Sequence, residues 1–367
     1  MVDCIVVGAG VAGGSAAYHL AKRGHAVLVL EKGQNPRPKV CSGAVSPAVA
    51  AWFDFDFAPV VTRRVNRVCL TWQMGDPINL TLDTPMWMVE RTDFDKFLLD
   101  QALAQGCQLQ GGTVVTGLSR RGDRWLVETD QGEFSSSYLI VADGAGGSLS
   151  KLLKLKDKKV RHSYALESPA MGADDHIYFD FGSLSNGYIW NFPKVGGRSL
   201  GVSTFRGGDP KPEDLSKYAS RFGLDESQLS TATTCIWDGN QPLHNDYALV
   251  AGEAAGLVDP LIGEGIRPGM YSGVEAAVAV SRALGGDRTA MTQYSQTIHK
   301  NLGEDMALGQ KLAGLFYQFP KIAYKAGLKR PAIGQVMSML LVGEISYTGI
   351  FDIAVQRLKA SMFGGGS

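Results

Sequence analysis

Apolar runs alternate with a helical pattern at the start of the chain. Asp3–Val7 and Ala26–Leu30 are short, almost wholly apolar runs, and Val11–Arg23 between them carries small and apolar residues at helical spacing. Strands that are apolar on both faces are typical of a parallel sheet with helices on its faces. These residues therefore predict a strand, a helix and a second, parallel strand.

The middle of the chain changes pattern several times. Six prolines interrupt residues 35–90, for which we expect irregular structure. Thr92–Gln105 is expected to be a helix with Thr92 as its N-cap. Residues 107–142 predict short strands that end in the apolar run Tyr138–Ala142, and residues 160–245 predict a mostly antiparallel sheet.

The last third is expected to be mainly helical. Ala248–Ala251 predicts one more buried strand, which a glycine-rich loop and a helix to about Leu284 follow. From Met291 onward the pattern predicts helices, among them Met306–Tyr317, Ala332–Leu341 and Ile350–Leu358. Polar residues interrupt the apolar stretch Ile333–Val355, so we expect a packed or interfacial helix there and no membrane span.

Composition and charge narrow the class of protein. The chain has 367 residues, of which 45% are hydrophobic and 20% charged, as in ordinary globular proteins. Lys+Arg and Asp+Glu are both 36, so no overall charge indicates a nucleic-acid partner. Five cysteines without a C-x-x-C pair favour neither a disulfide framework nor a zinc or other metal site. With no signal peptide at the N-terminus, we expect a cytoplasmic protein.

Basic and apolar residues alternate in one C-terminal stretch. The residues concerned are Phe319, Lys321, Ile322, Tyr324, Lys325, Lys329 and Arg330. Such a pattern is typical of a helix that lies on a membrane surface, and equally of a solvated helix with basic residues. Peripheral contact with a membrane and a purely soluble protein are therefore both open.

A glycine-rich motif follows the first predicted strand. Residues 8–13 read Gly-Ala-Gly-Val-Ala-Gly, in which Gly8 permits a tight turn, Gly10 close approach of a diphosphate, and Gly13 close packing of helix on strand. Glu31 ends the second strand, where a carboxylate accepts hydrogen bonds from ribose hydroxyls. The motif predicts dinucleotide binding. The alternative is a glycine-rich turn without a ligand.

Three later segments distinguish one dinucleotide from another. Arg91 precedes a predicted helix, residues 139–148 end a strand in Asp143-Gly144, and residues 249–266 run from Gly252-Glu253 to Gly263-Glu264-Gly265-Ile266. In this order the segments resemble the para-hydroxybenzoate hydroxylase-like flavoprotein superfamily, over most of residues 1–285. The resemblance implies FAD as cofactor. The usual Gly-Asp is Gly252-Glu253 here, so the contact of residue 253 is expected to shift or to run through water.

The resemblance also implies a set of FAD-binding residues. Gly8, Gly10, Ala12, Gly13 and Gly14 would cradle the diphosphate, and Glu31 with the adjacent Lys32 would hold the adenosine ribose. Arg91, Asp143, Gly144 and Glu253 would lie along the diphosphate and the flavin side of the cofactor. Gly263, Gly265 and Ile266 would pass under the isoalloxazine ring, and Cys41 would lie on a loop beside it.

An aromatic pattern bears on the class of substrate. Tyr188, Trp190 and Phe192 stand at alternate positions, so on a strand they share one face, as a broad apolar wall or as ordinary sheet core. The stretch matches the Y-x-W-x-F-P signature of the geranylgeranyl reductase family, a branch of the same superfamily. There the stretch lines a tunnel for a long prenyl chain. Residues 38–46, which include Cys41 and Ser42, resemble the family's cysteine loop.

Two residues keep alternative interpretations. Cys41 is either a small, semi-buried loop residue or a group that positions substrate or joins proton transfer. Arg267 is either an anchor for an anionic headgroup or a residue at the start of a helix that faces solvent. We take Cys41, Tyr188 and Trp190 as the candidate catalytic residues.

The predicted architecture is α/β, with a Rossmann-like FAD-binding domain, an inserted antiparallel-sheet substrate domain and a helical C-terminal region. The FAD-binding domain is expected to combine residues 1–45, 91–160 and 246–285, and the substrate domain residues 46–90 and 161–245. Residues 286–363 form the helical region and 364–367 a tail.

The family resemblance implies reduction of carbon–carbon double bonds in a geranylgeranyl-type lipid, with NADPH or ferredoxin as electron donor. An FAD-dependent monooxygenase acting on an apolar or aromatic substrate is the first alternative. A flavin-containing lipid-binding protein without turnover is the second.

Overall fold

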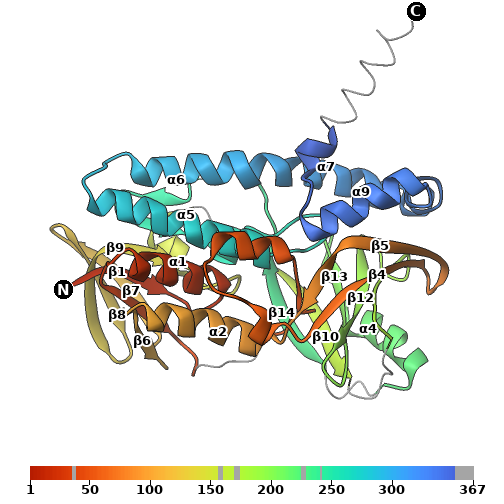
Figure 1. Cartoon of the computed structure of the whole chain (residues 1–367), viewed down its shortest axis with the longest axis horizontal. Coiled ribbons are helices and arrows are strands. Elements are labelled where there is room, and N and C mark those ends of the chain that lie inside the picture. Colours follow the sequence, from red (N-terminus) through yellow and green to blue (C-terminus); the bar gives the residue numbers. More distant parts are fainter. Residues whose placement is uncertain (35–38, 156–159, 169–173, 225–228, 240–241, 352–367) are drawn as a thin grey trace, which may run out of the picture.

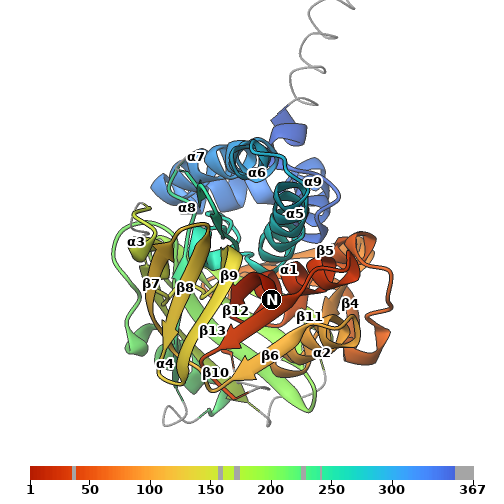
Figure 2. The ribbon, with the colours of Figure 1, turned by 90° about the vertical axis from the view of Figure 1, so that its left-hand side faces the viewer.

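The computed structural model describes residues 1–34, 39–155, 160–168, 174–224, 229–239 and 242–351. In this part of the chain, two eight-stranded sheets lie side by side, and a layer of helices runs along both (Figure 1). The layer consists of α5 (Ile266–Leu284), α6 (Ala290–Ile298), α7 (Glu304–Gln318) and α9 (Pro331–Val342). Seen end-on, these helices lie above the first sheet (Figure 2). The α/β architecture with a helical C-terminal region is thus confirmed.

The first sheet contains the predicted strand–helix–strand unit. Its strand order is β15-β16-β9-β1-β2-β6, and β7 and β8 continue from β9 as an antiparallel pair. The strands are β1 (Val2–Val7), β2 (Val27–Glu31), β6 (Gln108–Gly111), β7 (Val115–Arg121), β8 (Arg124–Thr129), β9 (Gly132–Val141), β15 (His244–Asn245) and β16 (Ala248–Val250). β1 pairs in parallel with β2 and β9, and β16 pairs in parallel with β9. α1 (Val11–Lys22) connects β1 to β2, as the apolar pattern predicts.

The second sheet is mostly antiparallel, which confirms the expectation for residues 160–245. Its order is β14-β10-β13-β12-β11-β4-β5-β3, and among the strands that the structure describes in this sheet only β11 and β4 pair in parallel. The strands are β3 (Ala44–Val45), β4 (Arg63–Trp72), β5 (Gly75–Met88), β10 (Val160–Ser168), β11 (His176–Phe181), β12 (Gly187–Lys194), β13 (Gly197–Thr204) and β14 (Ser230–Cys235). The short helices are η1 (Pro47–Trp52), η2 (Ala58–Val60), α3 (Leu149–Leu152), α4 (Pro212–Ala219), η3 (Ser220–Phe222), η5 (Gly252–Ala255), η6 (His299–Gly303), α8 (Pro320–Ile322) and η7 (Ala323–Leu328).

The expectation of irregular structure over residues 35–90 is wrong, because β4 and β5 form a long hairpin there. Pro77 and Pro85 misled the prediction, since proline removes a donor from a regular ladder. Both prolines lie where the register between the strands shifts, between Leu70 and Trp72 and between Val65 and Arg67 of β4. The hairpin therefore accommodates them without losing regular hydrogen bonds elsewhere.

The helix after β5 begins earlier than predicted. α2 (Arg91–Ala104) has Arg91 as its first residue and Glu90 at the N-cap position, without a side-chain cap bond. The prediction of Thr92 as N-cap is therefore wrong, since Thr92 lies inside the first turn.

Alternation along β12 directs its side chains to two different cores. Tyr188 and Phe192 belong to a cluster with residues of the C-terminal helices, such as Tyr317 and Val342. Ile189 points to the opposite face, where it packs with Leu200, Val202, Leu215 and Tyr218 next to α4. The shared face of Tyr188, Trp190 and Phe192 thus turns toward the helical layer.

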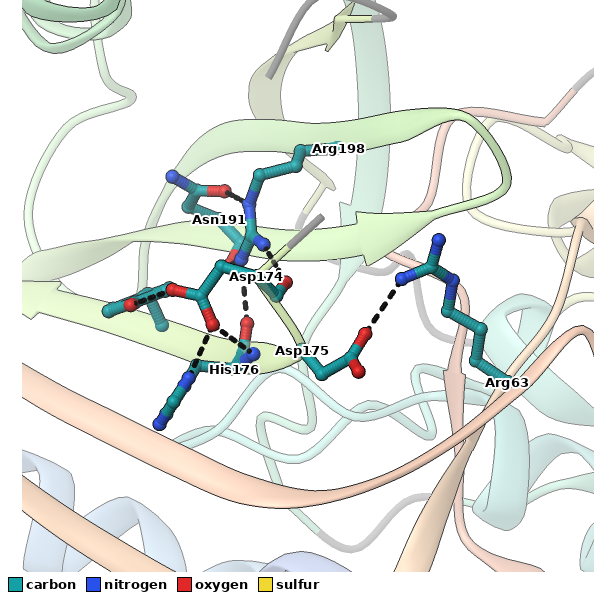
Figure 3. A network of polar contacts seen from close by, with 7 residues as sticks. Arg63, Asp174, Asp175, His176, Asn191 and Arg198 are labelled. Carbon is teal, nitrogen blue, oxygen red and sulfur yellow. Dashed lines mark hydrogen bonds and ion pairs between the residues drawn. The ribbon is translucent and has the colours of Figure 1, made fainter. Parts of the chain in front are cut away.

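A buried arginine fastens the end of this sheet. Arg198 of β13 donates from Nη1 to the carbonyl of Asp174 (2.6 Å) and from Nη2 to those of His176 (2.6 Å) and Asn191 (2.8 Å), and its Nε donates to the Asn191 amide oxygen (Figure 3). Burial lowers the pKa of Arg198 from its ordinary value. The guanidinium joins β11, β12 and β13 just beyond the aromatic stretch.

The C-terminal helices are attached to the β4–β5 hairpin. Tyr324 is fully buried, and its hydroxyl shares its one proton between the carbonyls of Leu70 (2.9 Å) and Asp76 (2.7 Å). α7 and α9 match the predicted helices Met306–Tyr317 and Ala332–Leu341. Most of Ile350–Leu358 and the tail 364–367 lie outside the described residues. Across the described ranges, no helix has the length and apolarity needed to cross a bilayer.

Candidate active site

Three distant chain segments meet at the carboxyl ends of parallel strands in the first sheet. The Ala142 N–H donates to the Val7 carbonyl (2.8 Å), and the Ala251 N–H donates to the Val141 carbonyl (2.9 Å). Gly8 has a φ of +103°, and a Cβ there would lie 2.3 Å from the Ala142 oxygen. The segments near residues 8, 142 and 252 therefore form one site, although the sequence separates them widely.

The N-terminus of α1 opens into this site. Gly10, Val11 and Ala12 line a cavity of ≈ 200 Å³. Among the described residues, no side chain caps the helix, and its first turn carries no acidic residue. The free N–H groups of a first turn and the helix dipole favour an anion. This end of the cavity therefore fits the diphosphate of a dinucleotide.

Arg91 and Cys41 meet beside that end. Both line the cavity, and the buried Arg91 guanidinium donates two hydrogen bonds of 2.9 Å to the carboxylate of Asp95. Burial by itself lowers the pKa of Arg91, but Asp95 and the Cys41 sulfur together hold it above its ordinary value. A fixed positive charge therefore lies next to the half-buried Cys41 thiol.

Glu253 is engaged by side chains from two other segments. Its carboxylate is 3.0 Å from the Lys39 ammonium and accepts a hydrogen bond from Thr234 (3.4 Å). Burial raises the pKa of Glu253, but Lys39 and then Arg91 outweigh it, so the pKa lies below its ordinary value. The residue that replaces the usual aspartate is thus ionised and lines the cavity.

The aromatic face of β12 forms the opposite wall of the cavity. Tyr188, Trp190 and Phe192 all line it, together with Phe179 and Phe205. The Tyr188 hydroxyl donates to the Ile262 carbonyl, and burial raises the pKa of this hydroxyl. The indole N–H of Trp190 has no acceptor among the described residues. The wall is therefore apolar except at a few fixed polar atoms.

A second cavity of ≈ 300 Å³ adjoins the first. It shares Phe179, Tyr188, Ile262 and Leu341 with the first cavity. The remaining lining is almost wholly apolar: Leu70, Phe181, Leu261, Leu312, Leu315, Phe316, Ala323, Leu328, Ile333, Val336, Met337, Leu340, Tyr347 and Ile350. Together, the two cavities extend from the polar N-terminus of α1 into the C-terminal helices.

The loop before α5 contributes to the lining of both cavities, since Ile262 lines the two of them. Asp259 accepts hydrogen bonds from the backbone N–H groups of Leu261 and Ile262 (both 2.8 Å) and from the Tyr347 hydroxyl (2.9 Å). Burial raises the pKa of Asp259 to about 6. Gly263, Gly265 and Ile266 of the same loop line the first cavity, as does Gly144.

Six of the predicted cofactor residues do not line the cavity. These are Gly8, Gly13, Gly14, Glu31, Lys32 and Asp143. Glu31 accepts hydrogen bonds from the backbone of Ala9 (2.7 Å) and Gly33 (3.0 Å), so it lies against the glycine-rich turn. A Cβ at Gly13 would lie 1.8 Å from the Gly8 oxygen, and Asp143 accepts from the Leu149 N–H (3.1 Å). These contacts order the backbone around the cavity.

Arg267 is the second residue of α5, with a side chain that is 30% exposed, as the helix-start interpretation expects. It pairs with Glu264 (3.5 Å) and lies against Gly343 at the C-terminal end of α9, outside the cavity lining. Three residues that contact the site were not predicted from the sequence: Lys39, Asp95 and Thr234. The i,i+4 spacing of Arg91 and Asp95 was a usable signal. The contacts of Glu253 with Lys39 and Thr234 depend on the fold and leave no local pattern.

Comparison with known proteins places these features in a family. Residues 3–70 match the family described as FAD dependent oxidoreductase. An uncharacterized protein of Methanosarcina barkeri is 30% identical over 98% of this chain and 94% of its own. The digeranylgeranylglycerophospholipid reductase of Methanocaldococcus jannaschii is 30% identical over 77% of each chain.

A solved structure shares the fold. It is a geranylgeranyl bacteriochlorophyll reductase-like protein of Thermoplasma acidophilum, with a TM-score of 0.76, 21% identity, and coverage of 86% of this chain and 87% of that one. The open α1 terminus and the three converging segments have the form of a dinucleotide-binding site. The chain is an FAD-dependent oxidoreductase and belongs to the geranylgeranyl reductase family.

Proposed function

We propose that this enzyme saturates carbon–carbon double bonds of an isoprenoid lipid. The observation that carries the proposal is the pair of adjoining cavities, which connects the FAD cradle to an almost wholly apolar space among the C-terminal helices. A prenyl chain is long and apolar, so it matches this space in shape and polarity. The relatives named digeranylgeranylglycerophospholipid reductase favour a lipid of that class as substrate.

The roles of the cofactor residues are part of this proposal. Gly8, Gly10, Ala12 and Gly13 hold the diphosphate at the start of α1, and Glu31 with Lys32 holds the adenosine ribose. Arg91, Gly144 and the Lys39–Glu253 pair line the path toward the flavin, and Asp143 orders the turn beside it through the Leu149 N–H. Gly263, Gly265 and Ile266 support the ring. When bound and reduced, FAD supplies the hydride.

The aromatic wall aligns the substrate. Tyr188 and Trp190 line the same cavity as Cys41, and Tyr188 is fixed by its hydrogen bond to Ile262. An isolated alkene has no carbonyl to withdraw electrons, so its reaction depends on alignment and on exclusion of water. The apolar wall contributes both.

Cys41 is proposed as the proton donor. Addition of hydride to one alkene carbon requires a proton at the other, and the Cys41 S–H bond breaks as the new C–H bond forms. The thiolate remains beside the Arg91 guanidinium and regains a proton from solvent. Cys41→Ala is expected to keep FAD bound and to slow reduction of the alkene by roughly 10²–10⁴-fold, as loss of a general acid does.

Anaerobic flavin reoxidation tests the function. The FAD-loaded protein is reduced with dithionite, and digeranylgeranylglycerophospholipid or geranylgeranyl diphosphate is added without oxygen. We expect the oxidised flavin spectrum to return and the product to gain two hydrogen atoms per turnover. NADPH and reduced ferredoxin are then compared as reductants in place of dithionite.

The same experiment separates the alternatives. A flavin that stays reduced until oxygen is admitted, and then yields a hydroxylated product, identifies a monooxygenase. A flavin that reoxidises with neither lipid contradicts the proposed substrate class.

A further inference from the structure

An apolar stripe is exposed on the C-terminal helices. Leu315, Phe319 and Ile322 are 62%, 52% and 65% exposed, and Phe351 is 58% exposed. Leu315 lies on α7, Ile322 lies on α8, and Phe319 lies at the junction of the two helices, where the backbone leaves the helical conformation. Large apolar side chains gathered on one surface mark an interaction site. We call these four residues the apolar stripe.

The surroundings of the stripe are basic. From Glu304 at the start of α7 to Phe351, the chain contains five basic residues, Lys311, Lys321, Lys325, Lys329 and Arg330, and three acidic residues, Glu304, Asp305 and Glu344. Lys329 pairs with Asp76, and Glu344 accepts a hydrogen bond from Thr84. The other four basic residues have no acidic partner in the part of the chain that the structure describes. The whole chain has no net charge, so this region concentrates positive charge.

The second cavity opens next to the stripe. Leu315 belongs both to the stripe and to the cavity lining, and Leu312 and Ile333 of the lining are themselves 38% and 39% exposed. These three side chains come from α7 and α9, which lie together on the side of the molecule opposite α4 (Figures 1 and 2). The gap between α7 and α9 is thus an apolar mouth within the basic surface.

We propose that the α7–α9 surface docks on an anionic lipid bilayer, with the apolar stripe in the interface and the cavity mouth facing the lipid. Apolar side chains enter the boundary between headgroups and acyl chains, and lysines beside them bind anionic headgroups. The proposal rests on the proposed function in taking the substrate to be a membrane lipid. A lipid tail then reaches the second cavity without crossing water.

Vesicle flotation with the FAD-loaded full chain tests the docking. We expect the protein to float with vesicles of phosphatidylglycerol and phosphatidylcholine, and to bind much less to phosphatidylcholine alone. Raising the salt from about 0.05 M to about 0.5 M is expected to release it, because the Debye length shortens. The flotation assay does not depend on turnover. A failure to bind vesicles would therefore leave the reductase proposal unaffected, and a failure to reduce lipid would leave the vesicle-binding result unaffected.

Paired variants separate the stripe from general surface effects. Leu315→Ser with Ile322→Ser, and Lys321→Glu with Lys325→Glu, are each expected to weaken partition at least roughly tenfold. The controls are Val195→Ser, which changes a 63% exposed residue in the β12–β13 turn, and Lys217→Glu on α4. Both controls should bind as the unchanged protein does.

A fluorescent label identifies any other occupant of the stripe. Ile322→Cys carries an environment-sensitive dye, and the unchanged protein treated in the same way corrects for labelling of Cys41. We expect a polar environment without vesicles and an apolar one with anionic vesicles. An apolar signal without vesicles would mean that residues 352–367 or a second copy cover the stripe, and would overturn the proposal. Equal binding by the stripe variants, or no binding to anionic vesicles, would do the same.

Discussion

Trp190 and Gly201 are directly opposite residues of β12 and β13, and the indole lies over the glycine. A Cβ at Gly201 would lie 1.8 Å from Cζ2 of Trp190. The position of the indole in the cavity wall therefore depends on the missing side chain of its neighbour. The glycine at this position of β13 therefore influences the shape of the substrate-binding space.

Gly201→Ala is expected to displace the Trp190 indole while FAD stays bound. Overpacking of this kind lowers the free energy of unfolding by about 1–3 kcal/mol, and the altered wall should lower the rate of flavin reoxidation by lipid. Urea unfolding and the anaerobic assay measure the two effects. Gly208→Ala is the control, since a Cβ there meets no atom within 4 Å. An unchanged rate with Gly201→Ala would show that the indole position is unimportant.

Asp259 gives the stability a pH dependence of its own. Burial raises its pKa to about 6 in the folded state, above the ordinary value of 3.8, so the folded state retains this proton to higher pH than the unfolded state. The residue's contribution to the free energy of unfolding therefore falls as the pH rises from about 4 to about 6. Asp259→Asn keeps an acceptor for Leu261, Ile262 and Tyr347 and removes the ionisation.

The variant Asp259→Asn is expected to be more stable than the parent at pH 7 and equally stable near pH 4. At about 1.4 kcal/mol per pKa unit, the gain is at most roughly 3 kcal/mol. Urea unfolding at both pH values with a fixed excess of FAD measures it. A gain of the same size at both pH values would contradict an ionisation effect.

Among the elements, α2 carries two ion pairs of the same spacing in different environments. Arg91 and Asp95 are 4% and 8% exposed, whereas Lys96 and Asp100 are 43% and 44% exposed. A buried guanidinium that loses its partner is costly, whereas an exposed pair contributes little. The comparison isolates burial, because both pairs lie on one helix at i,i+4.

Asp95→Ala is expected to lower the free energy of unfolding by about 3–5 kcal/mol and to weaken FAD binding, because Arg91 lines the cavity. Asp100→Ala should cost no more than about 0.5 kcal/mol and leave FAD binding unchanged. Thermal unfolding and FAD titration measure both. Equal losses in the two variants would argue against a special role of the buried pair.

Elements with strong local signals could be predicted from the sequence, and those that depend on partners could not. β1, α1 and β2 follow from apolar runs and glycines, and α5 from its helical pattern. The β4–β5 hairpin was missed because Pro77 and Pro85 argue against a strand unless the register shifts are known. In the site, the glycine motif and the aromatic alternation could be predicted from the sequence. The Lys39–Glu253 pair could not be predicted, because its two residues are 214 positions apart.

At the scale of the whole molecule, the two cavities lie between the second sheet and the helical layer. Leu341 on α9 and Phe179 on β11 line both of them. The length of substrate that the cavities can hold therefore depends on helices that are remote in sequence from the FAD cradle. A bulkier side chain at Leu341 would obstruct the connection without touching the residues around α1.

Leu341→Trp is expected to reduce activity with geranylgeranyl lipids more than with a short prenyl alcohol, and to leave the flavin spectrum unchanged. The physical reason is loss of the space that the distal part of a long chain needs. The ratio of kcat/KM for long and short substrates measures the effect. Met339→Trp on the same helix, outside the lining of both cavities, is the control. A ratio that stays constant would show that long chains do not enter the second cavity.

The convergence of segments near residues 8, 142 and 252 has a consequence for biosynthesis. A ribosome releases the chain from its N-terminus, so the glycine-rich turn emerges long before residues 252–266 that complete the cradle. Insertion of β16 beside β9 is a pairing of high sequence separation, which makes it slow compared with local helix formation. A nascent chain that stops short of α5 therefore has no complete flavin site. The yellow colour of bound flavin would appear only after synthesis has passed that helix, and would report in cells on chains that have finished folding.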